Sequence, residues 1–257
     1  MKKRLVGKVV GIGVGPGDPE LITIKAAKTL RAADVICVPK AHADTPSMAL
    51  GMIKQVLHER KILPVVLHLV FPMTKDEKKL QEAWAKNAEI VAERAMKGET
   101  VAFITLGDPM FYSTFVCLCQ SIKAKFPNVP LEIIPGVTSL TACAATARLP
   151  LAEQNEALAV IPAGFDPKQI GELAKNVDNL VLMKGVQRIK ELIPILEDAG
   201  FREDSTVALV RRSTLPEENV TLGRFADVKN WEIHDDYFSM VIIKKAKLNN
   251  CNGKGKE

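Results

Sequence analysis

The chain has 257 residues, of which 47% are hydrophobic and 25% charged, a composition typical of a globular protein with one large or two modest domains. Its formal net charge of +5 comes partly from the basic start and tail. We expect no nucleic-acid partner, because so small and scattered an excess of charge, with only two Trp and two Tyr, gives neither a basic nor a base-stacking surface.

The cysteines and the apolar stretches indicate in which cellular compartment we expect the protein. The five cysteines are odd in number and form no CxxC pair, which is typical of reduced thiols in a cytoplasmic protein. The N-terminal apolar stretch is interrupted by glycines, so it predicts a strand and a loop rather than a signal peptide. No run of about 18 apolar residues occurs, so we expect no membrane span. The four histidines lack an HxxxH spacing, and we expect no metal site.

In the first half of the chain, short apolar runs alternate with stretches of helical periodicity. We predict strands over 8–14, 35–38, 65–70 and 101–105, and helices over 20–32, 47–59, 75–97 and 111–125. This alternation predicts an α/β fold with a mainly parallel sheet for a first domain, residues 1–126.

The proline-bounded stretch 126–130 is the best linker candidate, and a second α/β domain with a mixed sheet is predicted over 127–246. Its first strands are expected over 131–134, 158–161, 180–183 and 206–210, with helices over 139–147, 167–175 and 186–199. Residues 221–225 and 237–243 are expected to close the sheet as an antiparallel pair. The polar segment 247–257 is predicted to be disordered.

A glycine-rich loop, Gly13-Val-Gly-Pro-Gly-Asp-Pro19, follows the first predicted strand. Glycines let the backbone turn sharply and approach a ligand closely, although a purely structural turn is an equal alternative. A dinucleotide fingerprint is disfavoured, because Pro16 stands at the position of its third glycine, after Gly11 and Gly13, and no acid ends the second strand. A P-loop is excluded, because no Gly-Lys-Ser/Thr follows.

Two further segments could bind a ligand. Leu106-Gly-Asp-Pro-Met-Phe-Tyr-Ser-Thr114 follows a predicted parallel strand, and open α/β sheets bind ligands at such strand ends. Its Asp108 could accept hydrogen bonds from a ligand or simply cap a helix. Ile134-Pro-Gly-Val-Thr-Ser139 presents two hydroxyls at a predicted helix start, where capping is again the alternative.

Together, and in this order, these three segments resemble the signature of the tetrapyrrole methylase family. Later stretches, Leu182-Met-Lys-Gly185 and Ala208-Leu-Val210, fit the same family, so the resemblance covers residues 7–245. The resemblance implies two α/β domains with S-adenosylmethionine as methyl donor in the cleft between them. It also implies a protein that is commonly a homodimer.

The resemblance carries over to individual cofactor-binding positions. Met183 stands where the family packs the adenine, and Ser213 falls where relatives often have the glycine of a Glu-Asn-Gly-Thr stretch; this chain reads Arg211-Arg-Ser-Thr214 there. The full set of implied cofactor-binding residues is Pro16, Leu106, Gly107, Asp108, Phe111, Thr138, Ser139, Met183 and Ser213.

Within the family, the stretch Asp108–Thr114 resembles the form found in methylases that act at C-20 of an early corrin precursor. The implied substrate is precorrin-2 or cobalt-factor II, in cobalamin biosynthesis, with the overall resemblance favouring the cobalt form. The alternatives are a methylase acting at a different carbon, a diphthine synthase, an RNA ribose methylase, and a nucleotide-binding module without enzymatic activity.

Methyl transfer from a sulfonium donor needs no protein nucleophile, so we expect residues that position the substrate rather than a catalytic triad. Asp108 and Tyr112 are the candidate catalytic residues. Basic residues near predicted loop ends could pair with substrate carboxylates, although a solvated surface charge is the alternative for each. The candidate substrate-binding residues are Lys40, Tyr112, Ser113 and Arg212.

Overall fold

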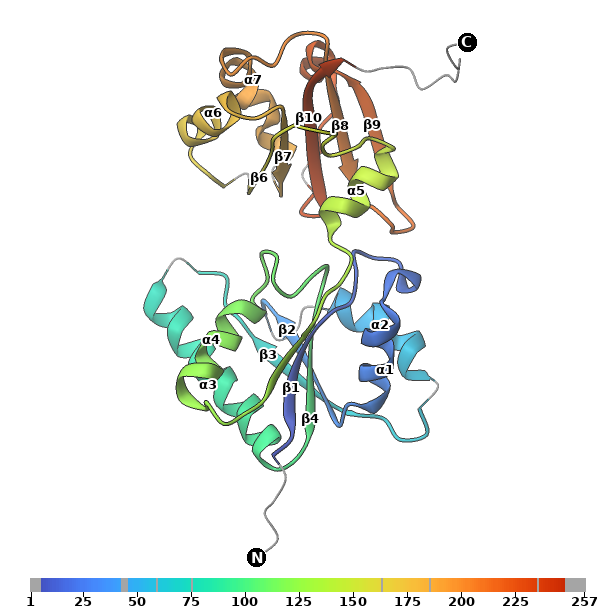
Figure 1. Cartoon of the computed structure of the whole chain (residues 1–257), viewed down its shortest axis with the longest axis vertical. Helices are drawn as coiled ribbons and strands as arrows, with labels where there is room; N and C mark the ends of the chain where they lie inside the picture. Colours follow the sequence, from blue (N-terminus) through green and yellow to red (C-terminus); the bar gives the residue numbers. More distant parts are fainter. Residues whose placement is uncertain are drawn as a thin grey trace, which may run out of the picture. The chain divides into compact units, whose positions relative to one another are not determined.

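The computed structural model describes residues 6–42, 46–58, 60–74, 76–162, 164–184, 186–234 and 236–247. The chain divides into two compact units, Met1–Ser139 and Leu140–Glu257. Both are α/β units, as the sequence predicts (Figure 1).

The first unit is built on a parallel sheet with strand order β3-β2-β4-β1-β5. The apolar runs of these strands are buried on both faces because helices cover each side (Figure 1). Helices α1 (Ile24–Ala32) and α2 (Met48–His58) cover one face, and α3 (Glu77–Met96) and α4 (Phe115–Lys125) cover the other. The strands are β1 (Lys8–Gly13), β2 (Val35–Lys40), β3 (Val65–Val70), β4 (Thr100–Thr105) and β5 (Leu131–Ile134).

Two predicted helices of this unit begin later than expected. In place of a helix from residue 20, a short 3₁₀ turn (Pro19–Leu21) precedes α1, whose N-cap is Thr23; the Thr23 hydroxyl accepts a hydrogen bond from Ala26 N at 3.2 Å. The helix predicted from residue 111 begins at Phe115, because residues 108–114 form turns in which Tyr112 has φ 51°. Residues 59 and 75, which end and begin two other predicted helices, lie outside the described residues.

The second unit contains a mixed sheet with strand order β6-β7-β10-β8-β9. Strands β6 and β7 are parallel, and the remaining pairs are antiparallel. Helices α6 (Pro167–Lys175) and α7 (Ile189–Asp198) pack on the sheet in one apolar core, while α5 (Ser139–Ala147) opens the unit (Figure 1). The strands are β6 (Leu158–Pro162), β7 (Asn179–Met183), β8 (Ser205–Arg211), β9 (Asn219–Arg224) and β10 (Ser239–Lys247).

The prediction that the last two strands pair with each other is wrong. Strand β10 lies between β7 and β8, and β9 pairs with β8 at the sheet edge. The physical reason is visible in their side chains: β10 has a continuous buried run from Ser239 to Lys244, whereas β9 has only exposed and half-buried residues. A strand buried on both faces belongs in the middle of a sheet, and a strand without buried residues tolerates an edge.

The division between the units lies between Ser139 and Leu140, not between residues 126 and 127 as the sequence suggests. The difference arises from β5, which follows the proline-bounded stretch. This strand pairs in parallel with β1 through Val9 to Ile12, so it completes the first sheet instead of beginning the second. The predicted tail after Lys247 lies outside the described residues.

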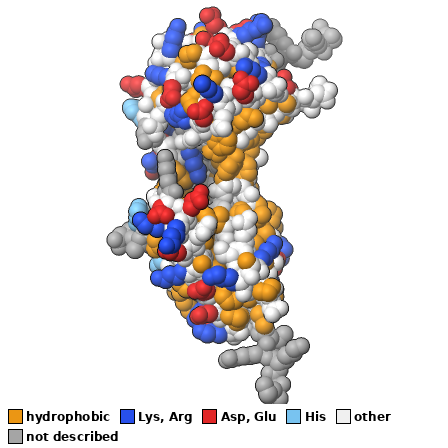
Figure 2. All heavy atoms as spheres, turned by 90° about the vertical axis from the view of Figure 1, so that its left-hand side faces the viewer, with side chains coloured by type: hydrophobic (Ala, Val, Ile, Leu, Met, Phe, Trp, Pro, Cys, Tyr) orange, Lys and Arg blue, Asp and Glu red, His pale blue; other side chains and the backbone are white. Residues whose placement is uncertain are grey.

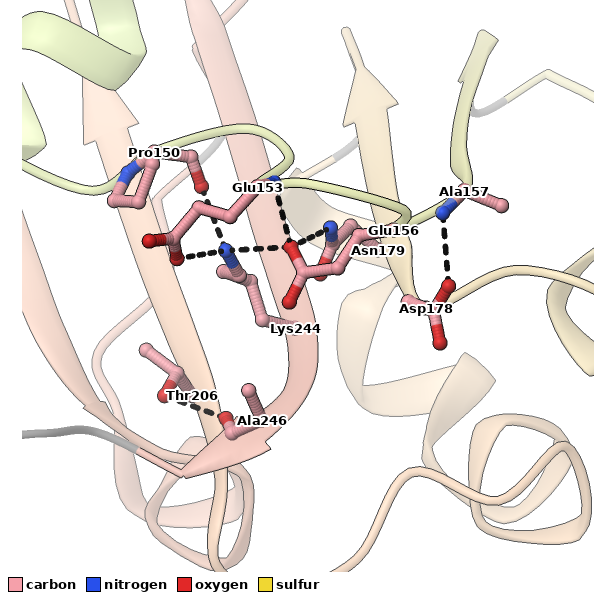
Figure 3. Close-up of polar contacts among 9 residues, drawn as sticks. All are labelled: Pro150, Glu153, Glu156, Ala157, Asp178, Asn179, Thr206, Lys244 and Ala246. Carbon is pink, nitrogen blue, oxygen red and sulfur yellow. Dashed lines mark hydrogen bonds and ion pairs between the residues drawn. The ribbon is translucent and has the colours of Figure 1, made fainter.

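A buried lysine ties the connection between α5 and β6 to the second sheet (Figure 3). The Lys244 ammonium, on a side chain only 4% exposed, donates to Pro150 O at 3.0 Å and lies 3.3 Å from Glu153 Oε2 and 3.1 Å from Glu156 Oε2. Glu156 Oε2 also accepts from Asn179 Nδ2 and from the Glu153 backbone N–H, both at 2.9 Å. The charge that β10 buries is therefore paired and hydrogen-bonded, as a buried ammonium must be.

Within the part of the chain that the structure describes, no helix is long and apolar enough to cross a membrane.

Candidate active site

The three segments singled out in the first unit lie at one edge of its sheet. Strands β4 and β5 flank β1 in parallel, with Gly13 opposite Thr105 and Ile12 opposite Ile134. The loops that follow these strands therefore leave the sheet at the same edge, where open α/β sheets bind ligands. The structure thus brings together the segments 13–19, 106–114 and 135–139, which are far apart in the sequence.

The glycines of these segments allow the three backbones to touch. Gly107 N donates to Gly15 O at 2.7 Å, and both residues have positive φ, +65° and +86°. A Cβ added to Gly13 or to Gly136 would lie 2.4 or 2.2 Å from Gly107 O, closer than any real side chain approaches. Gly13 and Gly136 are therefore needed for contact between loops, and for Gly13 this role differs from the ligand approach suggested by the glycine-rich pattern.

Asp108 joins two of the loops through its carboxylate. Its Oδ1 accepts from Met110 N at 2.8 Å, and its Oδ2 accepts from Gly136 N at 3.0 Å. The first bond closes the turn of its own segment, and the second reaches the segment after β5. The same carboxylate can still accept further bonds, because two oxygens offer about four lone pairs.

The neighbouring candidates point in different directions. Tyr112 is 54% exposed and its ring stands edge-on to that of Phe111, with 4.9 Å between the ring centroids. The Ser113 hydroxyl instead turns back to β4, where it donates to Thr105 Oγ1 at 3.1 Å and accepts from Phe115 N at 3.2 Å. Tyr112 is thus accessible to a ligand, whereas the Ser113 side chain accepts a hydrogen bond from the first residue of α4.

The remaining candidates of the first unit lie at the same edge of the sheet. Pro16, Leu106, Thr138 and Ser139 are half-buried. An ideal Cβ on Gly107 would lie 3.8 Å from Thr138 Cα and 3.9 Å from Ser139 N, in ordinary van der Waals contact with the segment after β5. Lys40 ends β2, which adjoins β4 in the parallel sheet, and its carbonyl accepts from Phe71 N at 2.8 Å.

The candidate residues of the second unit lie at one edge of the mixed sheet. Strands β7 and β8 end there at Met183 and Arg211, on either side of the start of β10. The chain then continues in the left-handed region, with φ 57° at Lys184 and φ 49° at Arg212. Met183 is 6% exposed, and Ser213 is 7% exposed. Non-glycine residues in this conformation are uncommon and concentrate at functional sites.

Arg212 has an acidic partner in this structure. Its Nε donates to Asp236 Oδ2 at 2.8 Å, and this bond raises the pKa of the guanidinium above its usual value. Asp236 Oδ1 accepts from Phe238 N at 2.8 Å, so one carboxylate orients both segments. The arginine contributes to an open hollow of about 310 Å³, which is lined by Arg211, Arg212, Glu217, Asn219, His234 and Asp236.

Sequence reasoning missed several residues of this edge. Asp236 and Tyr237 were not singled out, yet the Lys184 ammonium lies 4.8 Å from the centroid of the Tyr237 ring. Glu218 and Thr146 were also missed, although they hydrogen-bond at 3.1 Å. No local pattern marks these contacts, because the bonded or stacked side chains lie tens of residues apart in the chain.

Comparison with known proteins defines the class. The family model for tetrapyrrole (corrin/porphyrin) methylases matches residues 8–229, and the chain belongs to this family. A probable cobalt-precorrin-2 C(20)-methyltransferase of Methanocaldococcus jannaschii is 36% identical over 95% of this chain and 99% of its own length. A cobalt-precorrin-2 C(20)-methyltransferase of Salmonella typhimurium is 34% identical over 93% of this chain and 97% of its own.

A solved structure supports the fold. The uroporphyrin-III C-methyl transferase of Thermus thermophilus, in complex with S-adenosylhomocysteine, superposes with a TM-score of 0.66. The match covers 93% of this chain and 97% of the other at 23% identity, so the two share the fold.

Proposed function

We propose that this chain transfers a methyl group from S-adenosylmethionine to C-20 of precorrin-2 or of its cobalt-containing counterpart, cobalt-factor II, in cobalamin biosynthesis. The proposal is carried by the similarity, over more than nine-tenths of the chain, to two relatives named cobalt-precorrin-2 C(20)-methyltransferases. Those names favour the cobalt-containing substrate. A family member acting at another carbon, or on the protein substrate of a diphthine synthase, is the alternative.

The residues at the carboxyl edge of the first sheet fit S-adenosylmethionine. This cofactor is a nucleoside that carries a sulfonium, an ammonium and a carboxylate group, and backbone amides, carbonyls and hydroxyls can bind it without a cluster of ionised groups. A Cβ on Gly107 would lie in van der Waals contact with Thr138 and Ser139, so a glycine leaves the room beside these residues to a ligand. We assign cofactor binding to Pro16, Leu106, Gly107, Asp108, Phe111, Thr138 and Ser139 in this unit, and to Met183 and Ser213 in the second.

When bound, the sulfonium supplies an already activated methyl group, so the chain need not supply a nucleophile. Its task is to hold the accepting carbon in line, at about 3–3.5 Å, and to exclude water. Asp108 acts by fixing two loops through backbone bonds. Tyr112, with its accessible ring, is the candidate that touches the substrate. Lys40 and Arg212 would pair with substrate carboxylates, with Ser113 as a further contact.

The decisive experiment is an assay with the purified chain. We expect S-adenosylmethionine together with cobalt-factor II, or with precorrin-2, to give a product heavier by one methylene unit. Mass spectrometry gives the mass, and NMR with a ¹³C-labelled methyl group locates it at C-20. Methylation at another carbon would replace the proposed activity with that of a different family member, and no methylated tetrapyrrole would refute it.

We further infer that the chain forms a cytoplasmic homodimer and has no nucleic-acid partner. Acidic and basic side chains are interspersed over the face shown in Figure 2, which is unlike a nucleic-acid surface. Dimerisation is supported by β3, which pairs only with β2 among the described residues. No Lys, Arg, Asp or Glu occurs from Ile62 to Thr74, and several apolar side chains there are exposed, including Val65, Val66 and Val70.

A charge on this edge should separate the dimer. Val66→Lys places an ammonium on an apolar surface that a second copy would bury, so we expect the variant to be monomeric at micromolar concentration. Light scattering after size-exclusion chromatography measures the mass. Leu222→Lys, on the exposed edge strand β9, is the matched control and should remain dimeric. A Val66→Lys dimer, or a monomeric wild type, would contradict this interface.

A further inference from the structure

The turn between β8 and β9 is held in a conformation that its residues rarely adopt. Arg212 and Thr214 both have positive φ, 49° and 67°, and neither is a glycine. Such residues persist only where the surrounding structure determines them. Two hydrogen bonds within the turn, from Leu215 N to Arg212 O and from Glu218 N to Leu215 O, are each 2.9 Å long.

Two further side chains, those of Glu218 and Thr146, hold this turn in place through hydrogen bonds. Glu218 Oε2 accepts from Thr214 N at 2.7 Å and from Thr146 Oγ1 at 3.1 Å. The Thr146 hydroxyl, in the last turn of α5, lies 2.9 Å from Ser213 Oγ. Thr146 therefore connects α5 to both ends of the segment 213–218.

The direction of these bonds follows from the number of protons. A carboxylate only accepts, so the single proton of the Thr146 hydroxyl goes to Glu218, and the Ser213 hydroxyl donates its own proton to Thr146. The nearby Cys143 thiol, whose pKa burial raises to about 11, keeps its proton. The Ser213 side chain is thus buried and turned toward α5, and its only proton is used there, which leaves the Ser213 backbone as the donor for a ligand.

We propose that Thr146 and Glu218 are positioning residues, which hold residues 212–214 so that the Ser213 backbone and the Arg212 side chain meet the bound cofactor and substrate. This inference rests on the proposed function, since it takes that segment as part of the binding site. A ligand contact made by the backbone tolerates a side chain that is turned inward.

The test removes the hydroxyl but keeps the shape. Thr146→Val is nearly isosteric and breaks both bonds, whereas Thr146→Ser restores them. Thr221→Val, in β9 of the same hairpin, is the matched control. We expect Thr146→Val to speed amide hydrogen exchange in the peptide 211–219 and to raise the Kd of S-adenosylhomocysteine, measured by calorimetry, about fivefold. The KM for S-adenosylmethionine should rise with it, while kcat changes less than twofold. Thr146→Ser and Thr221→Val should behave as wild type.

The two measurements distinguish the restraint on the turn from the contribution of the turn to cofactor binding. Unchanged exchange in Thr146→Val would show that the hydroxyl does not hold the turn. Faster exchange with an unchanged Kd would show that the turn does not serve the cofactor, and either result overturns the proposal. If Thr146→Val fails to fold, Glu218→Ala replaces it, because truncation of this exposed side chain removes its bonds to Thr214 N and to the Thr146 hydroxyl. A wild type that binds no S-adenosylhomocysteine would refute the proposed function instead, and the exchange data would still test the turn.

Discussion

Replacing Asp108 with alanine is expected to raise the Kd for S-adenosylmethionine, or to lower kcat/KM, at least tenfold while the fold stays intact. The carboxylate accepts hydrogen bonds from Met110 N and Gly136 N, so its loss frees the loop after β4 from the loop after β5. A bond between a charged acceptor and a backbone N–H contributes about 1.5–3 kcal/mol, and a tenfold change in affinity corresponds to about 1.4 kcal/mol. Calorimetry and steady-state kinetics measure the effect.

The control for Asp108 is another aspartate that accepts from a backbone N–H. Asp166 caps α6 and accepts from Lys168 N at 2.9 Å, away from every candidate residue in the sequence. Asp166→Ala should cost stability without changing cofactor affinity. If Asp108→Ala binds and turns over like wild type, Asp108 has no part in the site. If it unfolds, circular dichroism shows the loss, and Asp108→Asn, which keeps one acceptor, becomes the informative variant.

The largest expected loss of stability comes from Glu156. Its Oε2 holds the buried Lys244 ammonium at 3.1 Å and accepts from Asn179 Nδ2, so Glu156→Ala leaves a buried charge and a buried amide with fewer partners. We expect the free energy of unfolding of the second unit to fall by about 2–3 kcal/mol, measured by chemical denaturation. Glu153→Ala is the matched control: this carboxylate is 62% exposed and 3.3 Å from the ammonium, so its loss should cost under about 1 kcal/mol.

The contacts of Glu156 also predict that the free energy of unfolding depends on pH. The hydrogen bond from Asn179, followed by that from Lys244, lowers the pKa of Glu156 below its ordinary value of 4.5. Because the folded pKa is the lower one, this stability is fully present above the unfolded pKa and is lost as pH falls through the folded pKa. The stability difference between wild type and Glu156→Gln should therefore shrink below about pH 4.5. A difference that stays constant down to pH 3 would contradict this origin.

Much of the architecture followed from local patterns. Continuous apolar runs such as Val35–Val38 predicted buried parallel strands. Helical periodicity placed each end of the long helix α3 within two residues of its observed bounds. The same patterns could not show which strands pair. Strand β5 looked like the start of a new domain because a proline-bounded stretch precedes it, but its partner, β1, lies more than a hundred residues earlier.

The candidate site, too, could be predicted from the sequence only in part. The glycine and Asp108 motifs could be found because each is a local signature of a loop that follows a strand. The sequence could not show that Gly13 and Gly136 serve contact between loops, since that depends on a carbonyl of Gly107. It also could not show that Ser113 turns toward Thr105 while Tyr112 stays accessible, or that Asp236 orients Arg212. Each of these depends on pairs of residues brought together only by the fold.

The central place of β10 has a consequence for synthesis on the ribosome. The first unit has all of its described strands once residue 134 has emerged, so it can fold while the rest is being translated. The second unit cannot, because β10 separates β7 from β8 and is the last of its strands to leave the exit tunnel. Until Ser239–Lys247 emerges, the nascent chain carries two apolar strands with unpaired edges. A stalled or truncated product ending before Ser239 should therefore depend on chaperones, with a folded first unit and an aggregation-prone second one.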